Sequence, residues 1–119
     1  MDNLQENLTS TAEQLDWTVT TEARNGSHTT FCFSKYTPYG QDFSFSAETF
    51  DNDADVLLEN IYEYYQSYDP DYEAYLWIGD DGHGHNGAPY HIIDIVKDMK
   101  AAENMVYELH TALSNAFNT

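Results

Sequence analysis

The stretch from Asp42 to Tyr68 reads DFSFSAETFDNDADVLLENIYEYYQSY, and its pattern changes halfway along. In the first half apolar and polar residues alternate, which is the period of a strand with one buried face (Phe43, Phe45, Ala47). In the second half apolar residues recur at helical spacing (Val56, Leu57, Ile61, Tyr64 or Tyr65, Tyr68). Asp51-Asn52-Asp53 stands between the halves, and aspartate favours the cap and first turn of a helix. The stretch therefore predicts a strand followed by a helix.

Two more strands and a helix are predicted before this stretch. Alternation predicts strands at Trp17–Thr21 and around Thr29–Tyr36, and Asn25-Gly26 between them is typical of a hairpin turn. Pro38 and Gly40 mark the next turn. A short amphipathic helix is predicted over 3–15, with one apolar face made of Leu4, Leu8, Ala12 and Leu15.

Helices and a loop are predicted after it. Pro70 interrupts the helix that begins near Asp53, and it can open another turn of helix through Tyr72–Ile78. Gly79–Gly87 contains four glycines and is predicted to be a loop. Pro89 can open a last helix over 90–117, whose core face would be Ile92, Val96, Met99, Ala102, Val106, Leu109, Leu113 and Phe117.

Together these elements predict an α+β fold of order αβββαα. An N-terminal helix is followed by a three-stranded antiparallel β-meander and by two to three helices packed on one sheet face. The 119 residues fit a single acidic α+β domain, 1–119. The first five elements resemble double-stranded RNA-binding domains in their order alone. Those domains hold phosphates with basic residues that this chain lacks, so we reject RNA binding.

Charge distinguishes the chain from an ordinary domain. It has 21 Asp and Glu against 4 Lys and Arg, for a formal net charge of -17. Thirteen acids and no Lys or Arg lie between Lys35 and Lys97. Such a field repels nucleic acids and anionic membranes and attracts basic proteins. The sequence shows no signal peptide and no apolar run of membrane-spanning length, and it has a single cysteine, so we expect a cytoplasmic protein.

The acids concentrate in a tyrosine-rich segment from Asp51 to Asp81. Asp55, Glu59 and Glu63 are spaced i, i+4, i+8, so they would stack on one solvent face, with no lysine to relieve their repulsion. A regular row of carboxylates on a rigid helix can imitate a row of phosphates, and tyrosine suits interfaces. We predict a partner-binding surface of Asp51, Asp53, Asp55, Glu59, Tyr62, Glu63, Asp69, Asp71, Glu73, Asp80 and Asp81.

Two plainer interpretations of the same acids stay open. The acidic face can be a solvated surface that keeps the protein dissolved, with the tyrosines mostly in the core. Alternatively, the whole chain can be adapted to high salt, because salt-adapted proteins are also acidic and poor in lysine. Neither interpretation needs a partner.

Small size, extreme acidity and an acid-studded, aromatic helical half (about residues 42–94) give the chain a recognisable character. In this it resembles the DNA-mimic inhibitors encoded by phages and mobile elements, which include antirestriction and anti-CRISPR proteins. The resemblance implies an inhibitor, not an enzyme, that blocks the basic nucleic-acid-binding cleft of a nuclease such as a CRISPR effector or a restriction enzyme. The partner would be a basic nucleic-acid-binding protein. We expect no direct binding to nucleic acid or membrane and no cofactor, and a homodimer is left open.

Two other functions remain as alternatives. The first is a regulatory or interaction protein, immunity- or antitoxin-like, that recognises a basic protein partner. The second is a metal-binding protein that uses His83 and His85, which are close enough to share an ion. Their spacing matches no metal motif, so a flexible turn is favoured and no metal ligand is predicted. Cys32 lies between Phe31 and Phe33, which predicts a packed or sheet-face thiol, and no catalytic residue is predicted.

Overall fold

The computed structural model describes residues 3–23, 28–85 and 87–117. Its elements follow in the order α1 (Asn3–Gln14), β1 (Thr18–Ala23), β2 (His28–Tyr36), β3 (Asp42–Phe50), α2 (Ala54–Ser67), α3 (Pro70–Tyr75) and α4 (Ile92–Phe117). This order confirms the predicted α+β fold. The predicted Asn25-Gly26 turn lies outside the described residues.

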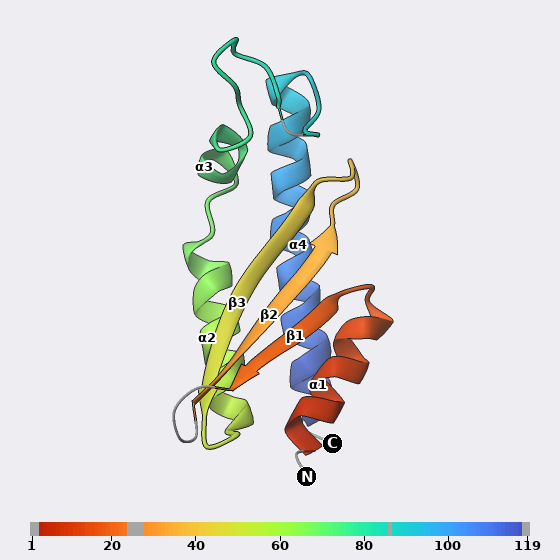
Figure 1. The fold of residues 1–119 in the computed structure, drawn as a ribbon, viewed down its shortest axis with the longest axis vertical. Helices are drawn as coiled ribbons and strands as arrows, with labels where there is room; N and C mark the ends of the chain where they lie inside the picture. The colour runs from red at the N-terminus through yellow and green to blue at the C-terminus, as the bar shows by residue number, and fades with distance from the viewer. Residues whose placement is uncertain (1–2, 24–27, 86, 118–119) are drawn as a thin grey trace.

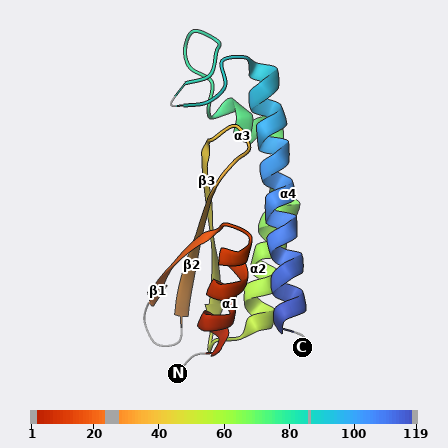
Figure 2. The ribbon, with the colours of Figure 1, turned by 90° about the vertical axis from the view of Figure 1, so that its right-hand side faces the viewer.

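The three strands form one antiparallel sheet in the order β1-β2-β3 (Figure 1). Phe33 in the central strand lies opposite Val19 on one side and Phe45 on the other. Buried and exposed residues alternate strictly along β3, as the sequence predicts. The helices lie on one side of this sheet and leave its polar face uncovered (Figure 2). The predicted one-sided meander is therefore confirmed.

An aromatic core joins the sheet to the helices. Trp17 makes edge-on contacts with Phe33, Phe43 and Phe45 at ring-centroid distances of 6.4, 6.2 and 5.6 Å. The helices add side chains that are fully buried against these rings (Leu8, Leu57, Ile61, Leu109, Leu113). Burial of each large apolar side chain stabilises a fold by about 1.5–3 kcal/mol. This core opposes the repulsion among the acids.

The molecule is elongated, with extents of 50 × 29 × 21 Å, because α4 continues beyond the end of the sheet (Figure 1). There α4 packs against α3 around a second, smaller core made of Ala74, Ile95 and Met99. Asp98 on the same helix is buried beneath the β2–β3 turn. Its carboxylate accepts hydrogen bonds from Thr37 Oγ1, Tyr39 N and Gln41 Nε2. The turn is thereby fixed to α4.

The last helix begins at Ile92, whereas we predicted its start near residue 90. Gly84 N donates to Tyr90 O at 3.1 Å, and a Cβ on Gly84 would lie 1.8 Å from Pro89 O. This close contact holds Pro89 and Tyr90 outside the helix. The predicted core face of this helix is also wrong at its start. Ile92, which we predicted to face the core, is 44% exposed, whereas Ile95 is buried.

The short helix after Pro70 also differs from the prediction, because it ends at Tyr75 and does not continue to Ile78. Ile78 instead forms an isolated β-bridge with Gly84. The same loop is held by His85 N, which donates to Trp77 O at 2.9 Å. Pairing within the loop therefore replaces the last helical turn.

Candidate functional site

The central row of the predicted surface lies on α2. Asp55, Glu59 and Glu63 are all exposed there, while Leu57 and Ile61 on the other side of the helix are buried. Successive acids in such a row are about 6 Å apart along the helix axis. The predicted stacking of these acids on one solvent face is confirmed.

Asp51 and Asp53 lie where β3 turns into α2. Asp51 and Asn52 both have a φ of 55°, a left-handed conformation that Asp and Asn tolerate better than most residues. Asp53 is the N-cap of α2, and its carboxylate accepts hydrogen bonds from Asp55 N at 2.9 Å and Val56 N at 3.4 Å. Asp53 therefore shapes the turn and adds exposed charge at the same time.

The acids beyond α2 have a similar double role. Asp69 caps α3 by accepting from Asp71 N at 3.0 Å and Tyr72 N at 3.5 Å. In the loop that follows, Asp81 accepts from His83 N at 3.1 Å. Asp69, Asp71, Asp80 and Asp81 are exposed.

These segments form one edge of the molecule. In Figure 1, α2 and α3 follow one another along the long axis on the left of the view, and the chain after α3 continues to the far end of the molecule. The predicted acids from Asp51 to Asp81 belong to these consecutive segments. We call the set of predicted residues the acidic edge. All of them are exposed except Glu73, which is half-buried.

Glu73 has a perturbed ionisation. Partial burial, followed by the nearby charge of Asp69, raises the pKa of Glu73. Burial and Glu73 together raise the pKa of Tyr64 to about 12. Glu73 also lines an open hollow of about 340 Å³ with Asp42 of β3 and Trp77. Asp42 was not among the predicted site residues because only the folded chain brings it beside α3.

The tyrosines divide between core and surface. Tyr68 is buried and donates to Met99 O at 3.0 Å, and Tyr64 stacks on Phe45 at a centroid distance of 4.7 Å. Tyr62, Tyr72 and Tyr75 are exposed. The tyrosines of this segment are therefore neither all interface residues nor all core residues.

Tyr62 and half-buried Tyr65 of α2 meet two rings of α4. The ring centroid of Tyr62 lies 5.3 Å from that of His110 and 6.0 Å from that of Tyr65. The ring centroids of Tyr65 and Tyr107 are 5.4 Å apart. Tyr62, Tyr107 and His110 line a hollow of about 280 Å³ with Thr111, Ser114 and Asn115. We call this the α2–α4 groove. The α4 side of the groove was not predicted from the sequence, although positions 107, 110, 111 and 114 have the spacing of one helix face.

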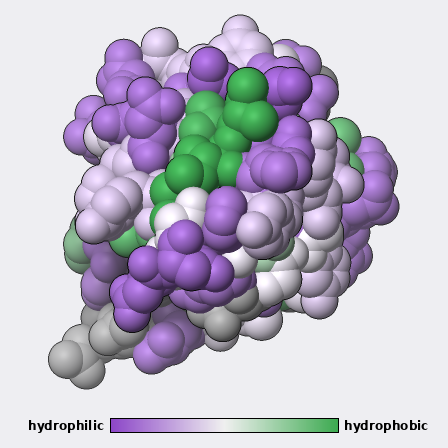
Figure 3. Space-filling view, turned by 90° about the horizontal axis from the view of Figure 1, so that it is seen from above, coloured by the Kyte–Doolittle hydropathy of each residue, from purple (hydrophilic) through white to green (hydrophobic). Residues whose placement is uncertain are grey.

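The end of the molecule beyond the sheet is apolar in part. Seen from that end, it shows a hydrophobic patch surrounded by hydrophilic side chains (Figure 3). Leu76 just after α3, and Ile92 and Ile93 at the start of α4, are 51%, 44% and 63% exposed. Asp80 and Asp81 belong to the loop at the same end.

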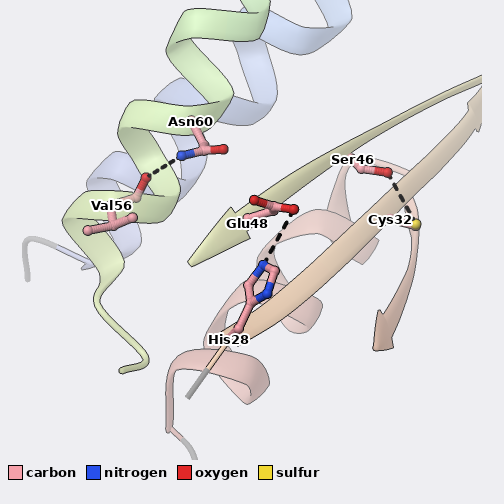
Figure 4. A network of polar contacts seen from close by, with 6 residues as sticks. All are labelled: His28, Cys32, Ser46, Glu48, Val56 and Asn60. Atoms are coloured by element: carbon pink, nitrogen blue, oxygen red, sulfur yellow. Dashed lines mark hydrogen bonds and ion pairs between the residues drawn. The ribbon is translucent and has the colours of Figure 1, made fainter. Parts of the chain in front are cut away.

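The uncovered sheet face carries small polar pairs (Figure 4). His28 Nε2 lies 3.4 Å from Glu48 Oε1, which makes an ion pair when the imidazole is protonated. Cys32 Sγ lies 3.3 Å from Ser46 Oγ on the neighbouring strand. Cys32 is therefore a half-buried sheet-face thiol, as predicted. On α2, Asn60 Nδ2 donates to Val56 O at 3.4 Å within the helix.

The loop that contains His83 and His85 is held by hydrogen bonds of its own backbone. Gly79 N donates to His83 O at 2.8 Å, and the His83 ring stacks on Tyr90 at a centroid distance of 4.0 Å. Across residues 3–23, 28–85 and 87–117, no group of three or more His, Cys, Asp or Glu side chains is arranged to hold a metal ion. None of the helices in the described part of the chain is long and apolar enough to cross a membrane.

The comparisons add no family to this picture. No protein-family model, no curated protein and no solved structure matches the chain.

Proposed function

We propose that this chain is an acidic inhibitor that mimics nucleic acid and blocks the basic nucleic-acid-binding cleft of a nuclease. The observation that carries the proposal is the exposed row of Asp55, Glu59 and Glu63, set within an edge of acids along the long axis. No Lys or Arg between Lys35 and Lys97 neutralises this edge. A surface of one sign with regular spacing suits a partner whose arginines and lysines otherwise hold phosphates.

The dimensions support the same proposal. B-DNA rises 3.4 Å per base pair, so the longest extent of 50 Å equals about 15 base pairs. A cleft that holds a duplex of that length could therefore be covered by one copy of the chain.

Inhibition would need no chemical step by this chain. Long-range attraction speeds the encounter with a basic cleft, and pairing of arginine with carboxylate holds the complex. The bound chain then excludes the nucleic acid by competition. Binding should weaken steeply as salt screens the charges.

Reversal of the α2 row tests the proposal. A partner is first captured from a host-cell lysate at low salt, and its affinity for purified variants is then measured by calorimetry. We expect Asp55→Lys, Glu59→Lys and Glu63→Lys together to weaken binding by at least about 100-fold and to abolish inhibition, because each replaces an attraction with a repulsion.

A matched control changes net charge equally at exposed acids outside the edge: Glu6→Lys, Glu13→Lys and Glu108→Lys. This control should retain most of the affinity. Equal losses in both variants would mean that only net charge matters, and full activity of the α2 variant would exclude the row as the site. Circular dichroism of each variant shows whether the fold is kept.

The exposed apolar end favours a second function, recognition of a basic segment of a protein partner. Leu76, Ile92 and Ile93 could take its apolar side chains while Asp80 and Asp81 pair with its cations. Competition separates the two functions, because duplex DNA or RNA should displace a mimic of nucleic acid from its partner but should not displace an apolar contact.

A further inference from the structure

The α2–α4 groove combines aromatic rings with negative charge. Three tyrosines and one histidine form a continuous series, in which Tyr107 contacts Tyr65, Tyr65 contacts Tyr62 and Tyr62 contacts His110. Tyr62 is 42% and Tyr107 47% exposed, so both rings are accessible to a ligand. The remaining wall is hydroxyl and amide groups of Thr111, Ser114 and Asn115, which can accept hydrogen bonds.

Acids flank these rings on both helices. Glu59 lies one turn before Tyr62 on α2, and Glu103 lies one turn before Tyr107 on α4, so each pair shares a helix face. Glu103 is also close to buried Tyr68, whose pKa it raises after the larger effects of burial, Glu73 and Tyr64. Burial lowers the pKa of His110, which favours its neutral form. The histidine therefore adds little positive charge to the groove at neutral pH.

This combination of rings and acids suits one kind of cation in particular. The face of a tyrosine ring attracts cations. A guanidinium group is planar, is more weakly hydrated than an ammonium group and presents five donors, so it can stack on a ring while it binds oxygen atoms. An ammonium group has no flat face to stack.

We propose that the α2–α4 groove is the part of the surface that recognises arginine, with guanidinium groups of the partner stacked on Tyr62 and Tyr107 and paired with Glu59. The inference rests on the proposed function in one respect, because it takes the partner to be a basic protein. It adds that this partner presents arginine, not only positive charge, to the side of the acidic edge that faces α4.

A second copy of the chain is a poorer occupant of the groove. Each copy carries a formal net charge of -17, and two copies joined through the groove would bring Glu59 and its neighbours close to like charges. Charge complementarity therefore favours a basic partner.

Two peptides of equal length and charge test the inference on the intact chain. Affinities for hexa-arginine and hexa-lysine are measured by calorimetry in 0.15 M NaCl. We expect hexa-arginine to bind about 5–30-fold more tightly, because a flat guanidinium group can stack on each of the two exposed rings while it pairs with an acid, whereas an ammonium group cannot stack. In the Tyr62→Ala, Tyr107→Ala variant the two peptides should bind with nearly equal affinity.

Two further variants serve as controls. Tyr62→Phe, Tyr107→Phe keeps both rings and should keep the preference for arginine, which also shows that loss of the hydroxyl groups is not the cause. Tyr72→Ala, Tyr75→Ala removes two other exposed tyrosines of the acidic half and should leave the preference unchanged.

The possible failures are distinguishable. If the wild-type chain binds both peptides equally, and the variant with Asp55, Glu59 and Glu63 changed to Lys binds neither, arginine recognition is overturned. The proposal that the acidic surface binds a basic partner would then still stand. Absence of binding by either peptide, even at low salt, would overturn both proposals. A dimer in sedimentation that the Tyr62→Ala, Tyr107→Ala variant disrupts would make the groove a self-interface and overturn the inference.

Discussion

At the scale of single residues, Asp98 has a structural role that could not be predicted from the sequence. It lies on α4 among residues at core spacing, yet it is an acid in a chain where acids are common. Its hydrogen-bond donors come from Thr37, Tyr39 and Gln41, which lie 61, 59 and 57 residues earlier. No local pattern connects such distant positions, so only the fold reveals that this acid is structural.

Removal of the Asp98 carboxylate should destabilise the protein strongly. Asp98→Ala leaves three donors at the β2–β3 turn without their acceptor, and we expect a loss of about 2–4 kcal/mol in the free energy of unfolding. Urea denaturation measures this loss. Glu108→Ala is the control, because it removes the same charge from an exposed position of the same helix. Equal midpoints for the two variants would show that the cluster contributes no stability.

At the scale of elements, features that depend on neighbouring residues could be predicted from the sequence, whereas features that depend on contacts formed only in the folded chain could not. The alternation in β3 and the helix start at Asp51-Asn52-Asp53 are local features, and both were predicted. The ends of α3 and the start of α4 depend on Gly84 packing against Pro89 and pairing with Ile78, and neither contact has a sequence signature. The exposed row on α2 was predictable from spacing alone, whereas the groove beside it required the packing of α2 on α4.

Gly84→Ala tests the contact that sets these ends. An added Cβ would lie 1.8 Å from Pro89 O and 3.1 Å from Ile95 Cδ1, so the loop must move away from α4. We expect a loss of about 1–3 kcal/mol, with faster hydrogen exchange at the His85 amide than in the wild type. Gly79→Ala is the control, since its Cβ would meet only atoms at 3.4–3.6 Å. Unchanged exchange in Gly84→Ala would contradict the role given to this contact.

At the scale of the whole molecule, the acids that suggest a function also oppose the fold. The aromatic core around Trp17 must hold together a chain of net charge -17. A partner that neutralises the acidic edge would relieve this repulsion, so binding and stability should be coupled through the same charges. Screening by salt provides the same relief without a partner.

Salt should therefore stabilise the free protein. We expect Tm to rise by about 5 °C or more between 0.01 and 0.5 M NaCl, because the screening length falls from about 30 Å to only a few ångströms. Circular dichroism melts measure the change. The Asp55→Asn, Glu59→Gln, Glu63→Gln variant removes three of the exposed negative charges. It should melt at a higher temperature than the wild type at low salt and should gain less from added NaCl.

A salt response of equal size in both proteins would assign the effect to general salting-out. A Tm independent of salt would mean that the acids lie too far apart to repel one another, and the surface would then be too diffuse to imitate nucleic acid.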